Sequence, residues 1–337
     1  MDGGRPRVVV THWVHPEVAD FLAGFCDPVL PSADEGDRGV WPIQWVAELA
    51  ADAAGLIVSM ADSVDDAFLS LCPRLRVVSA TLKGYDNFDA GACARRGIWL
   101  TILPDLLTAP TAELAAGLII GIMRRVAEAD RHVREDGFAG WRPRFYGATL
   151  RGATTGIVGM GEVGQALAAL LAPFGTRIVY HDARRLPAAA GQRLQAAPLS
   201  LPDLLAGSDV VITLLPLTSG TRRMVGRSAL RLMRPGAFLV NVGRGSVVDE
   251  EAVAEALDSG RLGGYAADVF AMEDWALPGH PAAIPARLLA HPRTLFTPHL
   301  GSAVDGVRRE MSLQAARQVQ QVLAGQRPDH AVNSPRR

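Results

Sequence analysis

Residues 155–164 read Thr-Gly-Ile-Val-Gly-Met-Gly-Glu-Val-Gly, and they carry the strongest local signal in the chain. A run typical of a buried strand ends at Val158, three glycines follow with Gly-x-Gly-x-x-Gly spacing, and a helical pattern continues to about Ala172. The first glycine permits a tight turn, the second admits a ligand close to the backbone, and the third lets helix and strand pack closely. We therefore predict that Gly159, Gly161 and Gly164 place the phosphates of a dinucleotide at a helix N-terminus.

An acidic residue follows this turn at the expected distance. Asp182 lies at the end of the next strand pattern, eighteen residues beyond Gly164. A carboxylate there can accept hydrogen bonds from both ribose hydroxyls and would repel a 2′-phosphate, which favours NAD over NADP. Arg184 and Arg185 come next and would admit NADP as a weaker secondary cofactor, although solvated surface arginines are the commoner explanation. The predicted cofactor is NAD.

Strand and helix patterns alternate along the whole chain, which predicts an α/β fold with two doubly wound, Rossmann-like parallel-sheet domains. A long helix is expected over residues 110–135, and a terminal helix over Gly306 to Gly325. The expected strands of the first group are Arg7 to Thr11, Gly55 to Ser59, Arg76 to Ala80 and Ile98 to Ile102. Those of the second group are Thr155 to Val158, Arg177 to His181, Asp209 to Leu215, Ala237 to Val242, Gly264 to Val269 and Thr294 to Thr297.

Composition excludes several classes of protein. The 337 residues are 49% hydrophobic and 20% charged with a net charge of −1, so we expect a folded chain that binds neither nucleic acid nor an anionic membrane. The longest apolar run, Leu114 to Met123, is too short to span a bilayer, and no secretory signal is apparent. Cys26, Cys72 and Cys93 lack metal-ligand spacing. We expect a cytoplasmic protein without a metal site or disulfide.

Three segments place polar side chains after successive strands of the second group. They are Val240 to Ser246, Ala267 to Trp275 and Thr297 to Gly301, and they contain Arg244, Glu273 and His299. Because parallel strands end at one edge of a sheet, we expect these side chains to lie together. The arginine would hold an anionic substrate, the histidine would exchange a proton, and the glutamate would orient the imidazole, which suits hydride transfer beside a nicotinamide.

The order of these motifs resembles the D-isomer-specific 2-hydroxyacid dehydrogenase family over nearly the whole chain. The resemblance implies that Arg244, Glu273 and His299 are catalytic. It implies a discontinuous substrate domain of residues 1–105 and 299–337, an inserted NAD domain of residues 106–298, and a homodimer built on the helix over 110–135. Cofactor contacts are implied, besides the three glycines, for Lys83, Thr111, Glu162, Val163, Asp182, Ala183, Leu214, Leu215, Pro216, Val242, Gly243, Arg244, Asp268 and His299.

Lys83 is the single lysine among 34 basic residues. The stretches Leu82 to Asp89 and Met272 to Trp275 resemble the phosphonate (phosphite) dehydrogenases within that family. This resemblance implies NAD-dependent oxidation of phosphite to phosphate, with water as the nucleophile and NADH as a product. A compact ammonium would suit a small dianion in a crevice of low dielectric. The implied substrate-binding residues are Lys83, Gly84, Met60 and Arg308, with Trp141 and Tyr146 closing over the partner subunit's site.

Alternatives remain at this stage. A D-2-hydroxyacid dehydrogenase acting on a small carboxylate would use the same arginine, glutamate and histidine, and a dinucleotide-sensing co-repressor would bind NAD(H) without turnover. Lys83 could survive by drift, and the aromatic loop could pack on its own domain. His299 could act as the base or chiefly orient the substrate.

Overall fold

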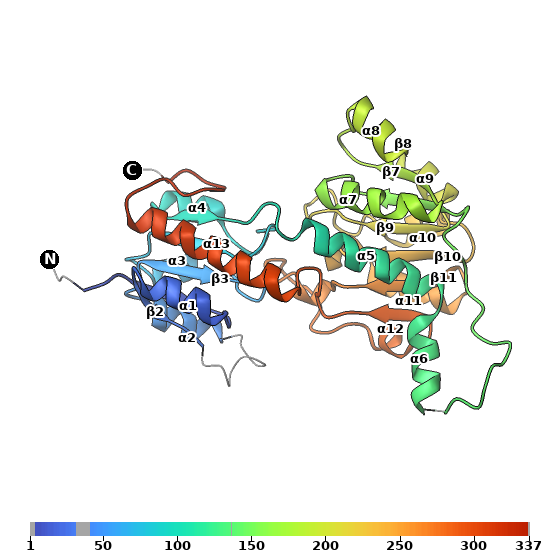
Figure 1. Cartoon of the computed structure of the whole chain (residues 1–337), viewed down its shortest axis with the longest axis horizontal. Coiled ribbons are helices and arrows are strands. Elements are labelled where there is room, and N and C mark those ends of the chain that lie inside the picture. Colours follow the sequence, from blue (N-terminus) through green and yellow to red (C-terminus); the bar gives the residue numbers. More distant parts are fainter. Residues whose placement is uncertain (1–3, 32–40, 136, 336–337) are drawn as a thin grey trace. The chain divides into compact units, whose positions relative to one another are not determined.

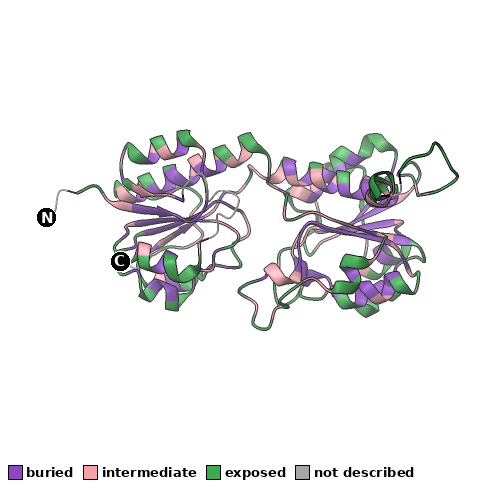
Figure 2. Ribbon diagram, turned by 90° about the horizontal axis from the view of Figure 1, so that it is seen from below, coloured by how far each residue is buried: buried purple, intermediate pink, exposed green. Residues whose placement is uncertain are grey.

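Two compact units make up the chain. The computed structural model describes residues 4–31, 41–135 and 137–335. The first unit comprises Met1–Leu107 and Ala303–Arg337, and the second comprises Thr108–Ser302. Each unit has its own parallel sheet with helices on both faces (Figure 1), and the strands are buried while the outer helix faces are exposed (Figure 2). The predicted α/β fold with two Rossmann-like sheets is confirmed.

The first unit contains a five-stranded sheet in the order β2-β1-β3-β4-β5. Its three central strands are rich in valine, and all their residues except Arg7 are buried, as expected for a sheet covered on both faces. The short edge strand β2, which the sequence analysis missed, contains Pro28, and proline is tolerated at a sheet edge. The strands are β1 (Arg7–Val10), β2 (Asp27–Val29), β3 (Gly55–Val58), β4 (Val77–Ala80) and β5 (Trp99–Thr101).

The C-terminal helix completes this first unit. Helix α13 (Asp305–Leu323) packs on β3, β4 and α1, where Ser79 Oγ donates to Gln318 Oε1 at 2.9 Å. The chain therefore returns to its first sheet after the second unit. The other helices of this unit are α1 (Pro16–Ala23), α2 (Ile43–Ala50), α3 (Asp66–Ser70) and α4 (Ala90–Arg95).

The second unit contains a seven-stranded sheet in the order β12-β11-β10-β9-β6-β7-β8. The strand order reverses between β6 and β9, and sheets of this kind bind ligands beyond the carboxyl ends of the strands at such a point. The strands are β6 (Thr154–Val158), β7 (Arg177–His181), β8 (Ala196–Pro198), β9 (Val210–Thr213), β10 (Ala237–Asn241), β11 (Leu262–Ala267) and β12 (Thr294–Phe296).

Short helices and 3₁₀ turns connect these strands and cover the sheet. The helices are α7 (Glu162–Leu171), α8 (Ala188–Leu194), α9 (Leu201–Gly207), α10 (Arg227–Leu232), α11 (Glu250–Asp258) and α12 (Ala286–Ala290). The 3₁₀ turns are η2 (Ala172–Phe174), η3 (Gly245–Val247) and η4 (Ala271–Glu273). Turns η3 and η4 pack on each other at the carboxyl edge of the sheet.

The single helix predicted over residues 110–135 is wrong in one respect, because two helices occupy this segment. Helix α5 (Thr108–Met123) packs on α7 and the sheet, whereas α6 (Val126–Glu135) has no buried residue among those described. The break falls at Arg125, whose φ is +56°. Its guanidinium donates to Glu128 at 2.7 Å and lies over the Phe145 ring at 5.5 Å, and these contacts offset the cost of the left-handed backbone.

The two ends of the second unit are hydrogen-bonded to each other. Thr111 Oγ1, in the first turn of α5, donates to the carbonyl oxygen of Gly301 at 3.1 Å. Gly301 directly precedes the last residue of the unit. The chain therefore enters and leaves this unit at neighbouring points. Within the described ranges, no helix is long and apolar enough to cross a membrane.

Candidate active site

The glycine-rich turn between β6 and α7 leaves space for a ligand. Gly159 has a φ of +104°, and a Cβ there would lie 2.8 Å from the Leu214 carbonyl oxygen. Gly161, the N-cap of α7, has no heavy atom within 4 Å of its ideal Cβ position. A Cβ on Gly164 would contact the carbonyl of Gly159, so the helix approaches the turn closely. This cradle of amides at a helix N-terminus fits a pyrophosphate.

Asp182 is fixed beside this turn. Its Oδ2 accepts a hydrogen bond from Met160 N at 2.7 Å, and its Oδ1 accepts one from Arg184 N at 2.8 Å. The carboxylate therefore has a defined position at the end of β7, as an acid that receives a ribose would need. Arg184 and Arg185 are exposed after it.

We expect Asp182→Ala to weaken the discrimination between NADH and NADPH by about 10- to 100-fold. Removing the carboxylate removes an acceptor for the ribose and the repulsion of a 2′-phosphate, and the neighbouring arginines then favour the phosphate. The ratio of kcat/KM for the two cofactors measures this effect. Asp203→Ala, an exposed carboxylate at the start of α9, is the control. An unchanged ratio in Asp182→Ala would show that the acid does not select the cofactor.

The other cofactor candidates of the second unit lie on the same edge of the sheet. A Cβ on Gly243, after β10, would lie 2.7 Å from the Leu215 carbonyl oxygen, after β9. The loops that follow neighbouring strands are therefore in close contact. Candidates placed on this edge by their elements are Glu162 and Val163 on α7, Ala183 after β7, Leu214, Leu215 and Pro216 after β9, Val242 after β10, Asp268 after β11, and Thr111 on α5.

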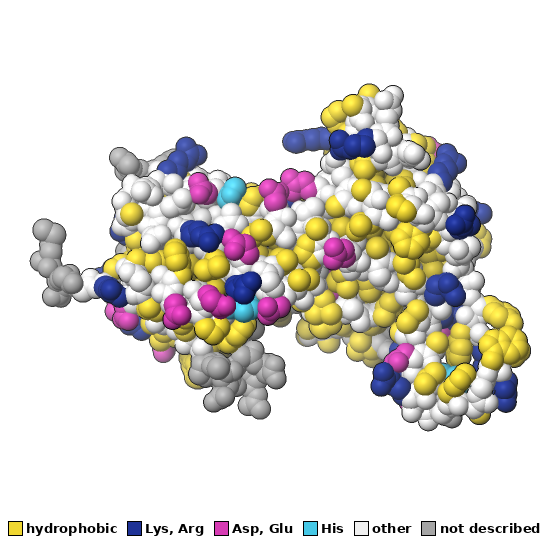
Figure 3. All heavy atoms as spheres, viewed as in Figure 1, with side chains coloured by type: hydrophobic (Ala, Val, Ile, Leu, Met, Phe, Trp, Pro, Cys, Tyr) yellow, Lys and Arg dark blue, Asp and Glu magenta, His cyan; other side chains and the backbone are white. Residues whose placement is uncertain are grey.

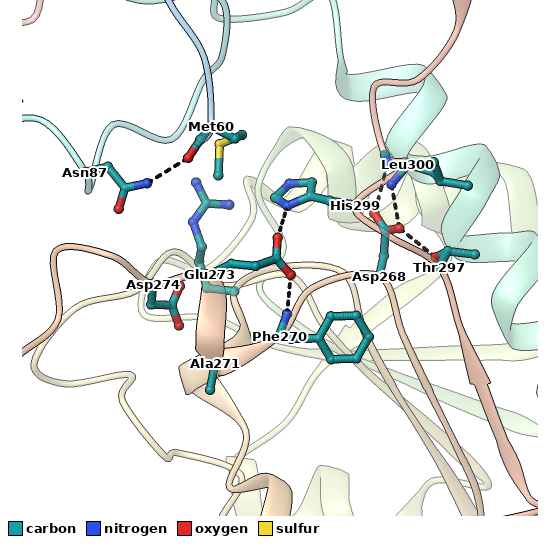
Figure 4. A network of polar contacts seen from close by, with 12 residues as sticks. Met60, Asn87, Asp268, Phe270, Ala271, Glu273, Asp274, Thr297, His299 and Leu300 are labelled. Atoms are coloured by element: carbon teal, nitrogen blue, oxygen red, sulfur yellow. Dashed lines mark hydrogen bonds and ion pairs between the residues drawn. The ribbon is translucent and has the colours of Figure 1, made fainter. Parts of the chain in front are cut away.

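His299 and Glu273 form a hydrogen-bonded pair. The imidazole Nδ1 lies 2.7 Å from Glu273 Oε2, and the other carboxylate oxygen accepts from Phe270 N at 2.8 Å. Glu273 is thus held by its own turn, η4, and points toward the imidazole (Figure 4). Both side chains are about three-quarters buried, with 27% and 25% exposure. With Nδ1 engaged by the carboxylate, Nε2 is the nitrogen left to exchange a proton.

The backbone of His299 is held in an uncommon conformation by Asp268. His299 has a φ of +58°, and its N–H donates to the Asp268 carbonyl at 2.9 Å. Asp268 Oδ1 accepts from Thr297 Oγ1 at 2.6 Å and from Leu300 N at 2.7 Å (Figure 4). Burial raises the pKa of this carboxyl, although the hydrogen bonds oppose that effect. Asp268 therefore positions the histidine loop, a role that the sequence analysis did not identify.

Arg244 begins the loop that contains η3. Asn241 Nδ2 donates to the Arg244 carbonyl at 3.0 Å, and Asn241 Oδ1 accepts from Thr213 Oγ1 at 2.8 Å. The fully buried asparagine thus fixes the backbone of Arg244 to the ends of β9 and β10. The guanidinium is half-buried, with Nη1 donating to Gly243 O at 3.0 Å. A half-buried guanidinium held in this way suits a small carboxylate.

The first unit holds the remaining substrate candidates at the carboxyl edge of its own sheet. Met60 follows β3, Lys83 and Gly84 follow β4, and Arg308 lies in the first turn of α13; all four are half-buried. Burial lowers the pKa of Arg308.

Sequence reasoning missed His12, which follows β1 at the same edge. His12 is buried, and burial together with the charge of Arg308 lowers its pKa to about 3, so the imidazole is neutral. A single histidine in a short loop gives no signal of burial. The carboxyl edge of the first sheet thus combines half-buried cations with a neutral imidazole.

The two aromatic candidates lie on the loop after α6. Trp141 is 75% exposed and Tyr146 is 73% exposed, and hydrophobic side chains gather over this loop (Figure 3). Phe145 of the same loop packs on its own domain against His132 and Arg125, whereas the rings of Trp141 and Tyr146 stay exposed. Their role toward a partner subunit stays a prediction.

Comparisons with known proteins agree on one family. Residues 116–301 match the model of the D-isomer specific 2-hydroxyacid dehydrogenase, NAD binding domain. A glyoxylate reductase of Aeropyrum pernix is 37% identical over 98% of this chain and 96% of its own length. The TT0316 protein of Thermus thermophilus superposes with a TM-score of 0.83 and 33% identity, covering 97% of this chain and 99% of that one.

A further similar structure contains two bound ligands. The NADPH-dependent glyoxylate/hydroxypyruvate reductase of Sinorhizobium meliloti, in complex with NADP and malonate, has a TM-score of 0.81 and 28% identity over 99% of each chain. The matching domain model confirms the predicted NAD-binding domain.

The prediction of phosphite oxidation is contradicted by these relatives. The Aeropyrum pernix protein is named a glyoxylate reductase and the Sinorhizobium meliloti protein a glyoxylate/hydroxypyruvate reductase, and neither is named a phosphonate dehydrogenase. The physical reason for the error is that phosphite and a 2-oxo acid are both small oxyanions. A cationic side chain suits either of them, so the single lysine does not distinguish the two reactions.

Proposed function

Because the chain belongs to the D-isomer-specific 2-hydroxyacid dehydrogenase family, we propose that it reduces a small 2-oxo acid of the glyoxylate class to the 2-hydroxy acid. The observation that carries this proposal is the Glu273–His299 pair, joined at 2.7 Å on the same sheet edge as Arg244. A carbonyl that accepts a hydride on carbon needs a proton on oxygen, and this pair can deliver one.

The histidine and the glutamate divide the proton transfer. In the reductive direction, His299 is protonated and donates from Nε2 to the carbonyl oxygen, which becomes the hydroxyl of the product. Glu273 fixes the ring through Nδ1 and stabilises the imidazolium, while Phe270 N holds the glutamate in place. In the reverse direction, the neutral imidazole removes the hydroxyl proton. Orientation and proton transfer therefore depend on one short chain of contacts.

The substrate's carboxylate is bound by the half-buried guanidinium of Arg244. A planar guanidinium can donate two parallel hydrogen bonds to a carboxylate and polarise the adjacent carbonyl. We assign the first unit to substrate binding, and its candidate cation is the half-buried Lys83 at the carboxyl edge of its own sheet.

The cofactor would be held by the turn of Gly159, Gly161 and Gly164 and by Asp182. When bound, reduced NAD supplies the hydride that becomes the new C–H bond of the product. The open space at Gly161 and the fixed carboxylate of Asp182 are the structural observations that fit it. Among the described residues no cluster of His, Cys, Asp and Glu could hold a metal ion.

The test is turnover by the purified chain with NADH and, in parallel, glyoxylate, hydroxypyruvate and pyruvate, followed by NADH absorbance. We expect glyoxylate to have the highest kcat/KM. Reverse assays with NAD⁺ use D-glycerate and phosphite. Oxidation of phosphite without reduction of any 2-oxo acid would overturn the proposal. NAD(H) binding without any turnover would favour a sensor instead.

A further inference from the structure

A second buried glutamate lies against the turn that carries Glu273. Glu250, the first residue of α11, is only 6% exposed. Its Oε1 accepts a hydrogen bond from Ala271 N at 2.8 Å, whereas Glu273 Oε1 accepts from Phe270 N at 2.8 Å. Two successive amides at the start of η4, those of Phe270 and Ala271, therefore donate to two different carboxylates. This places the charge of Glu250 close to the carboxylate that orients His299.

The same turn is joined to the Arg244 loop by two further contacts. Asp274 Oδ2 accepts from Ser246 N at 2.7 Å, and Asp274 is buried. A Cβ on Gly245 would collide with the peptide between Phe270 and Ala271, so the two backbones are in direct contact. The loop bearing Arg244 and the turn bearing Glu273 thus form one unit, and Glu250 is hydrogen-bonded to it.

We propose that Glu250 is a positioning residue, which fixes turn η4 through Ala271 N and, by its negative charge, favours the protonated form of His299 that Glu273 orients. The inference rests on the proposed function of the Glu273–His299 pair. Turn η4 connects the two roles, because it carries one carboxylate and is hydrogen-bonded to the other. Nothing in the proposed reaction requires Glu250 to contact the substrate.

The surroundings of Glu250 make its charge responsive to pH. Burial, followed by the charges of Asp274, Glu273 and Glu251, raises its pKa to about 7, although the hydrogen bond from Ala271 opposes this. Tyr265 on β11 is buried and neutral, since burial raises its pKa. On the packed helices α10 and α12, Arg227 pairs with Glu255 and Arg287 with Asp258, both carboxylates farther along α11. Helix α10 also carries Arg231 in its last turn. Glu250 therefore gains its charge near neutral pH.

The sign of each effect follows from this raised pKa. Above about pH 7, ionised Glu250 adds negative charge near the imidazolium and favours retention of its proton. The same buried charge lowers the stability of the fold. The protonated carboxyl of Glu250 stabilises the folded state relative to the unfolded one, and this stabilisation is lost as the pH rises through the pKa of the folded state. Glutamine has the same shape and still accepts from Ala271 N, but it lacks the charge. Glu250→Gln therefore separates the charge from the hydrogen bond.

The experiment compares the pH dependence of kcat/KM for glyoxylate reduction in the wild type, Glu250→Gln and Glu251→Gln. Glu251 is the matched control, since it is the next residue of the same helix and is exposed. We expect the alkaline loss of activity to move about 0.5 to 1 pH unit lower in Glu250→Gln, and to stay in place in Glu251→Gln. An unchanged alkaline midpoint in Glu250→Gln, or an equal shift in both variants, would overturn the proposal.

A second measurement does not depend on turnover. The quantity is the melting temperature of Glu250→Gln minus that of the wild type. We expect this difference to increase from pH 5 to pH 8, because only the wild type acquires the buried charge. A pH-independent difference would overturn the proposal even without a measurable activity. If Glu250→Gln does not fold, Glu250→Asp keeps the charge and is expected to keep the alkaline midpoint within about 0.3 pH unit of the wild type; a larger shift would contradict us. Failure of wild-type glyoxylate turnover would refute the proposed function alone.

Discussion

Replacement of His299 by asparagine is expected to lower kcat for glyoxylate reduction by about 10³-fold, because a positioned general acid contributes roughly 10²- to 10⁴-fold. Asparagine is the informative substitution here. The φ of residue 299 is +58°, a conformation that asparagine tolerates better than most residues. The loop held by Asp268 should therefore persist, while the proton donor is lost.

The measurements are steady-state kinetics, NADH binding by fluorescence and thermal unfolding. We expect the affinity for NADH and the melting temperature to stay close to those of the wild type. His280→Asn is the control for loss of an imidazole, since His280 is a half-buried histidine of the same unit whose ring contacts Trp275. Residual activity within tenfold of the wild type would assign the proton donor to another group.

The second large effect is expected for Arg244→Lys, which keeps the charge but removes the planar fork of donors. We expect kcat/KM for glyoxylate to fall by about 100-fold, mainly through a higher KM, because an ammonium cannot make two parallel hydrogen bonds to a carboxylate. The backbone should stay in place, since Asn241 binds the Arg244 carbonyl and not its side chain.

Arg234→Lys is the matched control for this variant. Arg234 lies in the same unit but is an exposed residue that pairs with Asp209 at 2.7 Å, and surface pairs of this kind contribute little to stability. Kinetics and NADH affinity of both variants should be measured together. A similar KM for Arg244→Lys and the wild type would mean that the carboxylate is held elsewhere.

Local rules predicted the parts of the fold that short stretches of sequence determine. The turn of Gly159, Gly161 and Gly164 follows from the steric needs of one strand and one helix, and it forms as expected. The edge strands β2 and β8 were missed because each has only three residues and includes a proline. So short a strand shows no alternation of apolar and polar residues by which it could be predicted. The helix break at Arg125 was missed because no residue pattern marks a left-handed arginine.

The residues of the candidate site also fall into those that local sequence patterns predict and those that they do not. Arg244, Glu273 and His299 could be selected because each follows a strand, and strand ends converge at one edge. Glu250 could not, because an acidic residue at a helix start is normally solvated, and its burial depends on a turn more than twenty residues later. The choice of substrate failed for a different reason. Lys83 is a single residue of one loop, whereas discrimination between two small oxyanions depends on all the residues that line the site.

The hydrogen bond between Thr111 and Gly301 has a consequence for how such a chain can arise and be altered. A segment whose two ends touch occupies a single attachment point on its host, so it can be inserted into, or exchanged within, a pre-existing domain without distorting it. The nucleotide-binding segment can therefore be transferred as one piece. If its two ends are joined directly, circularly permuted forms of the segment should keep the sheet intact.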